Sequence, residues 1–332
     1  MHERNIALDY FKFFLAVLVI TIHLYPEPVS IEWLIGDGIA RIAVPCFFII
    51  NGYYLALIIE NKEKFFGYLK KLIILYIVWM LIYSGFYYDD LFICSRRGII
   101  GSVLLIFTGY WHLWYISALI GASVLLYLVK GYNKYLLLGI SLILFVFGSF
   151  IYSLPLIDLS VFDGYSLFIV KYLYVFRVYL IRNFLFMGFP FVYIGWFLYY
   201  NKLKIGKLLN ILLVTLFLLL LLFESYTLNG FKLGPFNEFS IGQLFPFLMD
   251  YRLSLFFICP LLMVYFINNP VLRNDDGLIS KLASAVFFLH PLIISILDDR
   301  LNTYKSLFLV LFLSMIFGVV LIQLNKRIKI FL

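Results

Sequence analysis

The chain alternates long apolar runs with short breaks that contain charged residues, proline or glycine. A helix needs roughly 20 apolar residues to cross the hydrocarbon core of a bilayer. The sequence therefore predicts an all-α, polytopic membrane protein of about ten transmembrane helices. The predicted spans are residues 5–24, 38–59, 69–88, 112–129, 135–153, 183–200, 207–226, 251–268, 280–298 and 305–325.

The segments between these spans are short, with three exceptions. Residues 98–108 are apolar but too few to cross alone, so we expect a re-entrant or interfacial segment. Residues 154–182 and 227–250 are rich in Tyr, Phe and Gly, and we expect them to form a lid or an acceptor-binding surface at the outer face. No polar stretch is long enough for a soluble domain, so residues 1–332 are predicted to form a single membrane domain.

Composition and charge support this interpretation. The chain is 64% hydrophobic and 13% charged, whereas an ordinary soluble domain is about half apolar and roughly a quarter charged. The lipid bilayer is therefore the expected partner of most of its surface. Most of the 26 Lys and Arg residues fall on the side that holds both termini, which places the N- and C-termini in the cytoplasm. The net charge of +8 follows the span ends instead of forming one patch, which argues against nucleic-acid binding.

The first span carries three ionisable residues, Asp9, Lys12 and His23. Eleven steps of about 100° bring Lys12 and His23 to within about 20° of one face, some 16 Å apart along the axis. Asp9 lies three residues before Lys12 and can pair with it. Such groups cost about 2.5–3.5 kcal/mol within a membrane, so they are candidates for function. The alternative is that Lys12 only reaches toward the surface and His23 only bonds a neighbour.

Polar residues at the ends of other spans are further candidates. His112 begins the fourth span within an aromatic stretch that would also serve as an interfacial belt. Arg41 is either an interfacial anchor or a ligand for an anionic or carbonyl group. Asn51 offers a hydrogen-bonding side chain, and Gly52 offers a close helix contact, although both are also typical of simple helix packing.

Two further pairs leave the same choice open. Arg182 and Asn183 begin the sixth span and are either anchors or ligands. His290 precedes Pro291 in the ninth span, where proline frees a backbone carbonyl, so His290 is either a local hydrogen-bond donor or a catalytic group. The three cysteines lie far apart and no metal-ligand spacing occurs, so we expect no metal.

In this order and spacing, these residues resemble bacterial integral-membrane acyltransferase family 3, the O-acetylases of cell-envelope polysaccharides. The resemblance runs from Arg4 to about Gln323. The family has Arg, ten residues, then His in its first helix, and here Lys12 and His23 occupy those positions. Its Phe-Phe-x-x-Ser-Gly-Tyr pattern reads here Phe47-Phe48-Ile49-Ile50-Asn51-Gly52-Tyr53.

Within the family, four stretches are most similar to the membrane portion of vancomycin-resistance serine racemases. They are Arg41–Pro45, His112–Tyr115, Arg182–Asn183 and Leu289–Pro291. Those proteins continue into a soluble racemase domain that this sequence does not contain, so we expect no racemisation.

The resemblance implies acyl transfer, with acetyl-CoA from the cytoplasm as donor and a hydroxyl of an envelope glycan or small precursor as acceptor. His23 would deprotonate that hydroxyl or carry the acyl group, Asp9 would orient Lys12, and Lys12 would meet the CoA phosphates. The acceptor would be held by residues in the matching motifs, namely Arg41, Asn51, His112, Trp114, Tyr115, Arg182 and Asn183.

Two other functions remain open at this point. A transport module for serine or a similar small solute is the runner-up, since the racemase membrane portion is associated with serine supply. A flippase or a structural partner of a polysaccharide assembly complex is the third, and it requires no particular role of His23. The sequence fixes no oligomeric state, and a homodimer is one alternative.

Overall fold

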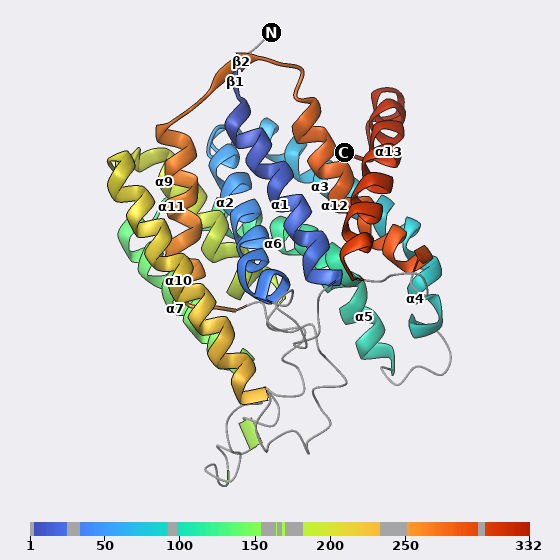
Figure 1. Ribbon diagram of the computed structural model, residues 1–332, viewed down its shortest axis with the longest axis horizontal. Helices are drawn as coiled ribbons and strands as arrows, with labels where there is room; N and C mark the ends of the chain where they lie inside the picture. Colours follow the sequence, from blue (N-terminus) through green and yellow to red (C-terminus); the bar gives the residue numbers. More distant parts are fainter. Residues whose placement is uncertain are drawn as a thin grey trace.

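The computed structural model describes residues 3–24, 34–91, 98–153, 164, 168–169, 182–232, 251–297 and 303–332. The described chain is built almost entirely from helices (Figure 1). They are α1 (Ile6–Leu24), α2 (Ala43–Leu55), α3 (Lys62–Ile82), α4 (Ser84–Leu91), α5 (Gly98–Thr108), α6 (Trp114–Val129), α7 (Lys134–Ser153), α9 (Phe189–Asn201), α10 (Lys207–Lys232), α11 (Leu255–Asn268), α12 (Leu278–Leu297) and α13 (Thr303–Ile328).

Shorter turns extend some of these helices. The π-turn η1 (Leu34–Gly38) and the 3-10 turn η2 (Ile39–Ile42) lead into α2, η3 (Trp111–Leu113) leads into α6, and η6 (Phe184–Gly188) leads into α9. Two short strands, β1 (Glu3–Asn5) and β2 (Leu272–Asn274), pair antiparallel with Arg4 opposite Arg273.

The all-α membrane architecture predicted from the hydrophobic pattern is confirmed. Within the described ranges, eight helical segments are long and apolar enough to cross a membrane, and α11 is a shorter apolar helix. Their outer surfaces carry many exposed large hydrophobic side chains, such as Leu128 and Phe308. The chain is thus a multi-pass membrane protein, while the total of ten spans and the cytoplasmic termini stay predictions.

Two predicted span boundaries differ from the structure. The third span was placed at 69–88, but α3 begins at Lys62, because the Asn61 side chain accepts a hydrogen bond from Lys64 N at 3.0 Å and caps the helix. The charged residues in the first turn of α3 are compatible with a helix, because the Asn61 cap satisfies a backbone N–H at its start. The second span was placed at 38–59, whereas helical structure runs from Leu34 to Leu55 and turns follow.

The segments outside the predicted spans are only partly described. Residues 98–108 form α5, and its re-entrant or interfacial position stays a prediction. The expected lid or acceptor-binding surfaces at 154–182 and 227–250 lie mostly outside the described residues.

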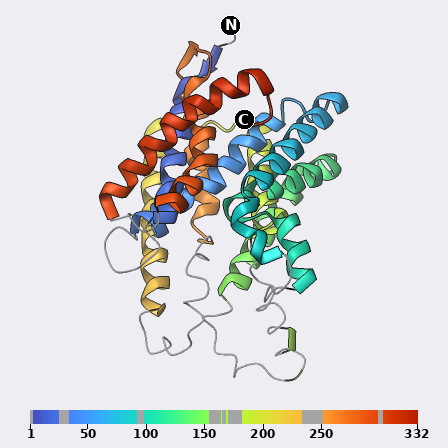
Figure 2. The same cartoon turned by 90° about the vertical axis from the view of Figure 1, so that its right-hand side faces the viewer.

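Polar contacts join the short connections that carry the predicted cytoplasmic charges. Lys130 Nζ donates to Ile59 O at 3.1 Å and pairs with Glu60 at 2.6 Å, and Lys134 Nζ donates to Asn201 Oδ1 at 2.6 Å. These connections lie toward the end of the bundle that holds the N-terminus and the β1–β2 pair (Figures 1 and 2). Lys130 and Lys134 therefore lie toward the same end of the molecule as the N-terminus.

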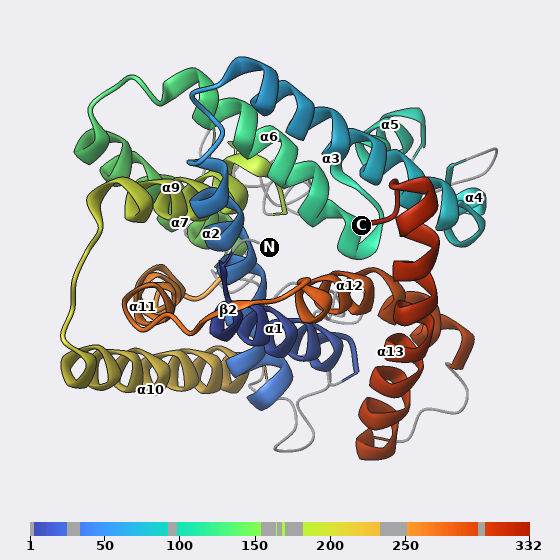
Figure 3. The same cartoon turned by 90° about the horizontal axis from the view of Figure 1, so that it is seen from above.

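Viewed along the bundle, α1 and α2 lie centrally between α10 and α11 on one side and α12 and α13 on the other (Figure 3). The crossing of α2 and α9 is the tightest helix contact. A Cβ added at Gly52 would lie 2.0 Å from Val192 O, and one at Gly195 would lie 2.0 Å from Ile49 O. The close contact expected at Gly52 is confirmed, and it is of the small-residue kind that lets membrane helices pack backbone to backbone.

Candidate functional site

Two ionisable residues of α1, Lys12 and His23, contact the same neighbouring helix, α12. Lys12 Nζ lies 3.3 Å from Ser280 Oγ, and the His23 ring lies 5.3 Å from the ring of His290, centroid to centroid. Ser280 and His290 both belong to α12 and are separated by nearly the same number of residues as Lys12 and His23. The predicted shared face of Lys12 and His23 is confirmed by these contacts.

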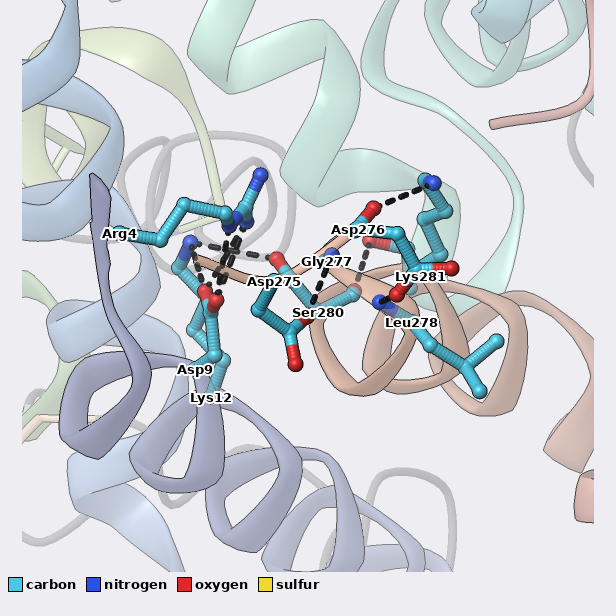
Figure 4. Close-up of polar contacts among 10 residues, drawn as sticks. Arg4, Asp9, Lys12, Asp275, Asp276, Gly277, Leu278, Ser280 and Lys281 are labelled. Atoms are coloured by element: carbon cyan, nitrogen blue, oxygen red, sulfur yellow. Dashed lines mark hydrogen bonds and ion pairs between the residues drawn. The ribbon is translucent and has the colours of Figure 1, made fainter. Parts of the chain in front are cut away.

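At the N-terminal end of α1, three charged side chains form one group. Asp9 is buried and accepts hydrogen bonds from Arg4 Nε at 3.1 Å, from Arg4 Nη2 at 3.3 Å and from Lys12 Nζ at 3.3 Å (Figure 4). The predicted pairing of Asp9 with Lys12 is thus present. Two cations share this carboxylate, which leaves one positive charge within the hydrogen-bonded group.

This group lines a cavity of about 460 Å³, together with Glu3, Asn5 and Tyr54. That volume lies within the roughly 300–1,000 Å³ typical of small-molecule sites. Lys12 Nζ also stands 4.9 Å from the centre of the Tyr54 ring, a favourable cation–aromatic contact. The cavity wall therefore combines two cations, two carboxylates, an amide and an aromatic ring.

The loop before α12 leaves room for Arg4. Gly277 has φ +71°, and a Cβ at this position would lie 2.7 Å from Arg4 Cζ (Figure 4). A residue with a side chain would be strained here by its backbone and would also displace the guanidinium. Glycine at 277 is therefore part of how the chain places Arg4 over Asp9.

At the other end of α1, three histidines from three elements converge. His23 of α1 and His112 of η3 both approach His290 of α12, with ring centroids 5.3 and 5.6 Å away. His112 and His290 are buried, and His23 is partly buried. Within the described residues, no group of three or more His, Cys, Asp or Glu side chains is placed to hold a metal ion.

Trp111 holds the His23 ring from the side. Its indole Nε1 donates to His23 Nδ1 at 3.2 Å, and the two rings meet edge to face. Trp111 has φ +48°, a left-handed conformation that costs a residue with a side chain about 1–2 kcal/mol. Backbone strain of this kind concentrates at functional sites, because the surrounding structure must maintain it.

The hydrogen bonds assign the proton positions in two of the three rings. A carbonyl can only accept, so His290 Nδ1, 3.0 Å from Val286 O, is the protonated nitrogen of that ring. His290 is thus a local donor, but its bond goes to Val286 O, whereas Phe287 O is the carbonyl that Pro291 leaves without its helical donor. His290 Nε2 and both ring nitrogens of His112 have no hydrogen-bond partner among the residues that the structure describes.

Arg41 lies in a separate buried cluster. Its Nε and Nη2 donate to Asp37 Oδ1 at 3.1 and 2.8 Å, and Arg252 Nη2 donates to Asp37 Oδ2 at 3.1 Å. Arg41 also borders a small cavity of about 10 Å³, room for roughly one water, beside Trp114. The structure therefore places Arg41 in an ion pair with the chain's own carboxylate, with its guanidinium near that cavity.

Asn51 and Tyr115 bond each other. Asn51 Nδ2 donates to Tyr115 Oη at 2.8 Å and to Phe47 O at 2.9 Å, so both amide hydrogens are used within the chain. This contact links α2 to α6, and the Tyr115 ring packs against Phe47 and Phe287. The two residues thus connect the packing of α2 to the aromatic surroundings of the histidines.

Arg182 and Asn183 have different neighbours. The Arg182 guanidinium lies 5.9 Å from the centre of the Trp114 ring. Asn183 Oδ1 accepts from Leu185 N at 2.8 Å and from Phe186 N at 3.0 Å, so this side chain caps the helical turn that leads into α9. The contacts of Asn183 are those of a helix cap.

The sequence pointed only weakly to several residues of this site. Arg4, Tyr54 and Ser280 contact the Lys12 group, and Trp111 contacts His23, although none of the four stood out as a candidate. Their signal lies in long-range pairing that one sequence does not reveal. For His290, the signal was present, since a histidine next to a proline within a span already required an explanation.

Comparison with known proteins identifies the family of the chain. A family model described as an acyltransferase domain matches residues 5–324 of the chain. This chain belongs to that acyltransferase family. The family resemblance predicted from the short motifs is confirmed.

The curated relatives are racemases. An amino-acid racemase of Enterococcus faecalis is 25% identical over 360 aligned positions, which cover 99% of this chain and 48% of that protein. A serine/alanine racemase of Enterococcus gallinarum is 32% identical over 136 positions, 37% of this chain and 19% of that protein. The chain thus spans about half the length of the racemase that it matches from end to end. No solved structure matches the chain significantly.

Proposed function

We propose that this chain O-acetylates a hydroxyl of a cell-envelope polysaccharide or its precursor, in the bacterial cytoplasmic membrane, with cytoplasmic acetyl-CoA as the acyl donor. The observation that carries the proposal is the common face of α1 and α12. It presents a cavity lined by Arg4 and Lys12 at one end and three convergent imidazoles at the other. A donor with anionic phosphates and an acceptor with a hydroxyl need these two chemistries.

The cavity at the N-terminal end of α1 fits the phosphate-bearing part of acetyl-CoA. Arg4 and Lys12 supply the charge, and Asp9 fixes both of them in place. Asn5 and Tyr54 complete a wall that can contact polar and aromatic parts of a nucleotide. In this proposal the end of the bundle that holds β1 and β2 faces the cytoplasm, where acetyl-CoA is found.

His23 fits the chemical step. As a general base it takes the proton of the acceptor hydroxyl while that oxygen attacks the acetyl carbonyl carbon, and the carbon–sulfur bond breaks to release the thiolate. In the alternative covalent route His23 first accepts the acetyl group and then passes it on. Both routes require an imidazole that is not held in an ion pair. The one hydrogen bond to His23 in the described chain comes from the neutral indole of Trp111.

His112 and Arg41 are proposed to stabilise the oxyanion or position the acceptor, a role worth roughly 3 kcal/mol per donor. His112 suits it because both of its ring nitrogens lack a partner among the described residues. Trp114, Tyr115 and Arg182 would shape the acceptor site from α6 and its surroundings. Asn51 and Asn183 would support it indirectly, through the hydrogen bonds that hold α2, α6 and the start of α9.

The experiment measures transfer from labelled acetyl-CoA. Purified protein in proteoliposomes is incubated with an envelope fraction from cells that lack the gene, and the alkali-labile label in envelope material is counted. We expect transfer by the wild type and none by His23→Ala. Membrane insertion and thermal stability of His23→Ala should match the wild type, because His23 accepts only one side-chain hydrogen bond there.

A second arm tests the alternative function. The same proteoliposomes are assayed for uptake of labelled serine without acetyl-CoA. Uptake together with no acetyl transfer would replace the proposal by a transport module. Acetyl transfer that His23→Ala retains in full would instead remove His23 from the reaction. Mass spectrometry of envelope glycans from cells with and without the gene then identifies the acetylated sugar.

A further inference from the structure

His290 has a free ring nitrogen that the proposed reaction does not yet use. The side chain is fully buried, yet its Nε2 has no hydrogen-bond partner in the described part of the chain. Leaving a polar atom buried and unpaired costs about 1–3 kcal/mol, so an unpaired nitrogen in a native site calls for an explanation. Its nearest titratable neighbours are the imidazoles of His23 and His112.

The hydrogen bonds give the two facing rings complementary tautomers. His23 Nδ1 accepts from Trp111, so the proton of a neutral His23 ring is on Nε2. His290 Nδ1 donates to Val286 O, so the lone pair of that ring is on Nε2. Nε2 is therefore a donor in His23 and an acceptor in His290. The ring centroids lie 5.3 Å apart, and the ring planes are inclined by 30°.

We propose that His290 is the proton-accepting partner of His23, so that the two histidines act as a relay during acyl transfer. This inference rests on the proposed acyltransferase function. Trp111 indicates where the substrate hydroxyl would bind. Its N–H donates to His23 Nδ1, and the hydroxyl must donate its proton to the same nitrogen. The role of His290 is to receive a proton from His23, so that the positive charge formed in the reaction is not confined to one ring.

The proton transfers balance in this scheme. The acceptor hydroxyl displaces the Trp111 N–H and gives its proton to His23 Nδ1 as its oxygen attacks the acetyl carbon. His23 passes its Nε2 proton to His290 Nε2, and the carbon–sulfur bond of the thioester breaks. The departing thiolate then takes the proton on His23 Nδ1, His290 returns its Nε2 proton to His23 Nε2, and both rings regain their first tautomers. The products are the O-acetyl ester and the free thiol.

Burial supplies the energetic reason for a relay. An isolated charge in an apolar interior is costly, and aromatic rings surround this pair, including Phe287, which packs near both His112 and His290. A single imidazole would carry the whole positive charge there. Sharing the proton between two imidazoles spreads that charge over two rings.

Pro291 offers a purely structural explanation for His290, and the test must separate the two. His290→Asn keeps an amide N–H that can donate to Val286 O but removes the unpaired ring nitrogen Nε2. Ser295→Ala is the matched control, because Ser295 Oγ donates to Pro291 O at 2.9 Å on the same helix and touches neither histidine partner. Both variants are assayed for transfer from labelled acetyl-CoA to the envelope fraction.

We expect His290→Asn to lower kcat by about 10²-fold or more, the lower end of general acid–base contributions, with the KM for acetyl-CoA within threefold of the wild type. Ser295→Ala should keep both constants within threefold. Rates in mixtures of H2O and D2O add a readout that helix packing does not affect. The wild type should give the curved dependence of two moving protons, and His290→Asn a straight line.

Several results would overturn the relay. They are a kcat of His290→Asn within threefold of the wild type, an equal loss in Ser295→Ala, and the same curvature in both isotope series. If His290→Asn is not monodisperse in detergent, His290→Gln is judged by the same criteria. A wild type without acetyl transfer would instead refute the proposed function, so the two failures are distinguishable.

Discussion

The crossing of α2 and α9 makes a quantitative prediction for Gly52→Ala. The added methyl carbon would lie 2.0 Å from Val192 O, whereas real Cβ contacts essentially never fall below 3.0 Å. The two backbones must therefore separate by about 1 Å, the difference between those distances. The atoms nearest to the added methyl carbon are backbone atoms of Val192 in α9, so no side-chain rotation can relieve the clash.

Overpacking of this kind typically costs 1–3 kcal/mol. That is roughly a 5- to 150-fold fall in the ratio of folded to unfolded protein. The cost should extend to function, because separating α2 from α9 shifts the neighbouring Asn51, which bonds Tyr115 at 2.8 Å. Gly195→Ala should behave in the same way, since its Cβ would lie 2.0 Å from Ile49 O.

The assay is unfolding of the purified protein in mixed micelles with increasing SDS, followed by tryptophan fluorescence. Gly139→Ala is the matched control, because Gly139 lies within α7 and a Cβ there meets nothing within 4 Å. It should leave stability unchanged or raise it by up to about 1 kcal/mol through better helix propensity. Equal midpoints for Gly52→Ala and Gly139→Ala would refute the close-packing argument.

Two further predictions concern the charged groups. Asp37→Asn should cost about 3–5 kcal/mol of stability and leave little folded protein, because Arg41 and the fully buried Arg252 both bond this carboxylate. Glu60→Gln, at an exposed ion pair, should cost at most about 1 kcal/mol. Equal expression of both variants would contradict the argument. Lys12→Ala should raise the KM for acetyl-CoA roughly 10- to 150-fold, the equivalent of a charge-assisted hydrogen bond of about 1.5–3 kcal/mol. In the same initial-rate assay, the KM of Lys12→Arg and of the exposed Lys62→Ala should stay near that of the wild type. An unchanged KM in Lys12→Ala would remove Lys12 from the donor site.

The membrane fold follows from hydrophobic periodicity, since lipid requires every span to satisfy its own backbone hydrogen bonds. Periodicity also places Lys12 and His23 on one face of α1, as their contacts with α12 confirm. Span boundaries were less predictable. α3 begins within a charged segment because Asn61 caps it, and this local hydrogen bond outweighs the average hydropathy of the segment.

The candidate site was predictable only as far as local spacing reaches. The pairing of Asp9 with Lys12 depends on a three-residue interval and is present. The addition of Arg4 depends on Gly277, and the position of Trp111 beside His23 spans 88 residues of sequence. Periodicity within one helix says nothing about which helix will lie opposite, so these contacts required the structure.

The antiparallel strand pair has a consequence for the order of assembly. β1 begins the described chain and β2 precedes α12, so their hydrogen bonds join residues 3–5 to residues 272–274. Because the chain is made from its N-terminus, α1 enters the membrane long before its partner strand and α12 leave the ribosome. α1 must therefore stay in the membrane, with Asp9, Lys12 and His23 beside other groups, until β2 and α12 have been synthesised. Truncation anywhere before α12 would leave an inserted protein whose earliest helix never acquires its final neighbours.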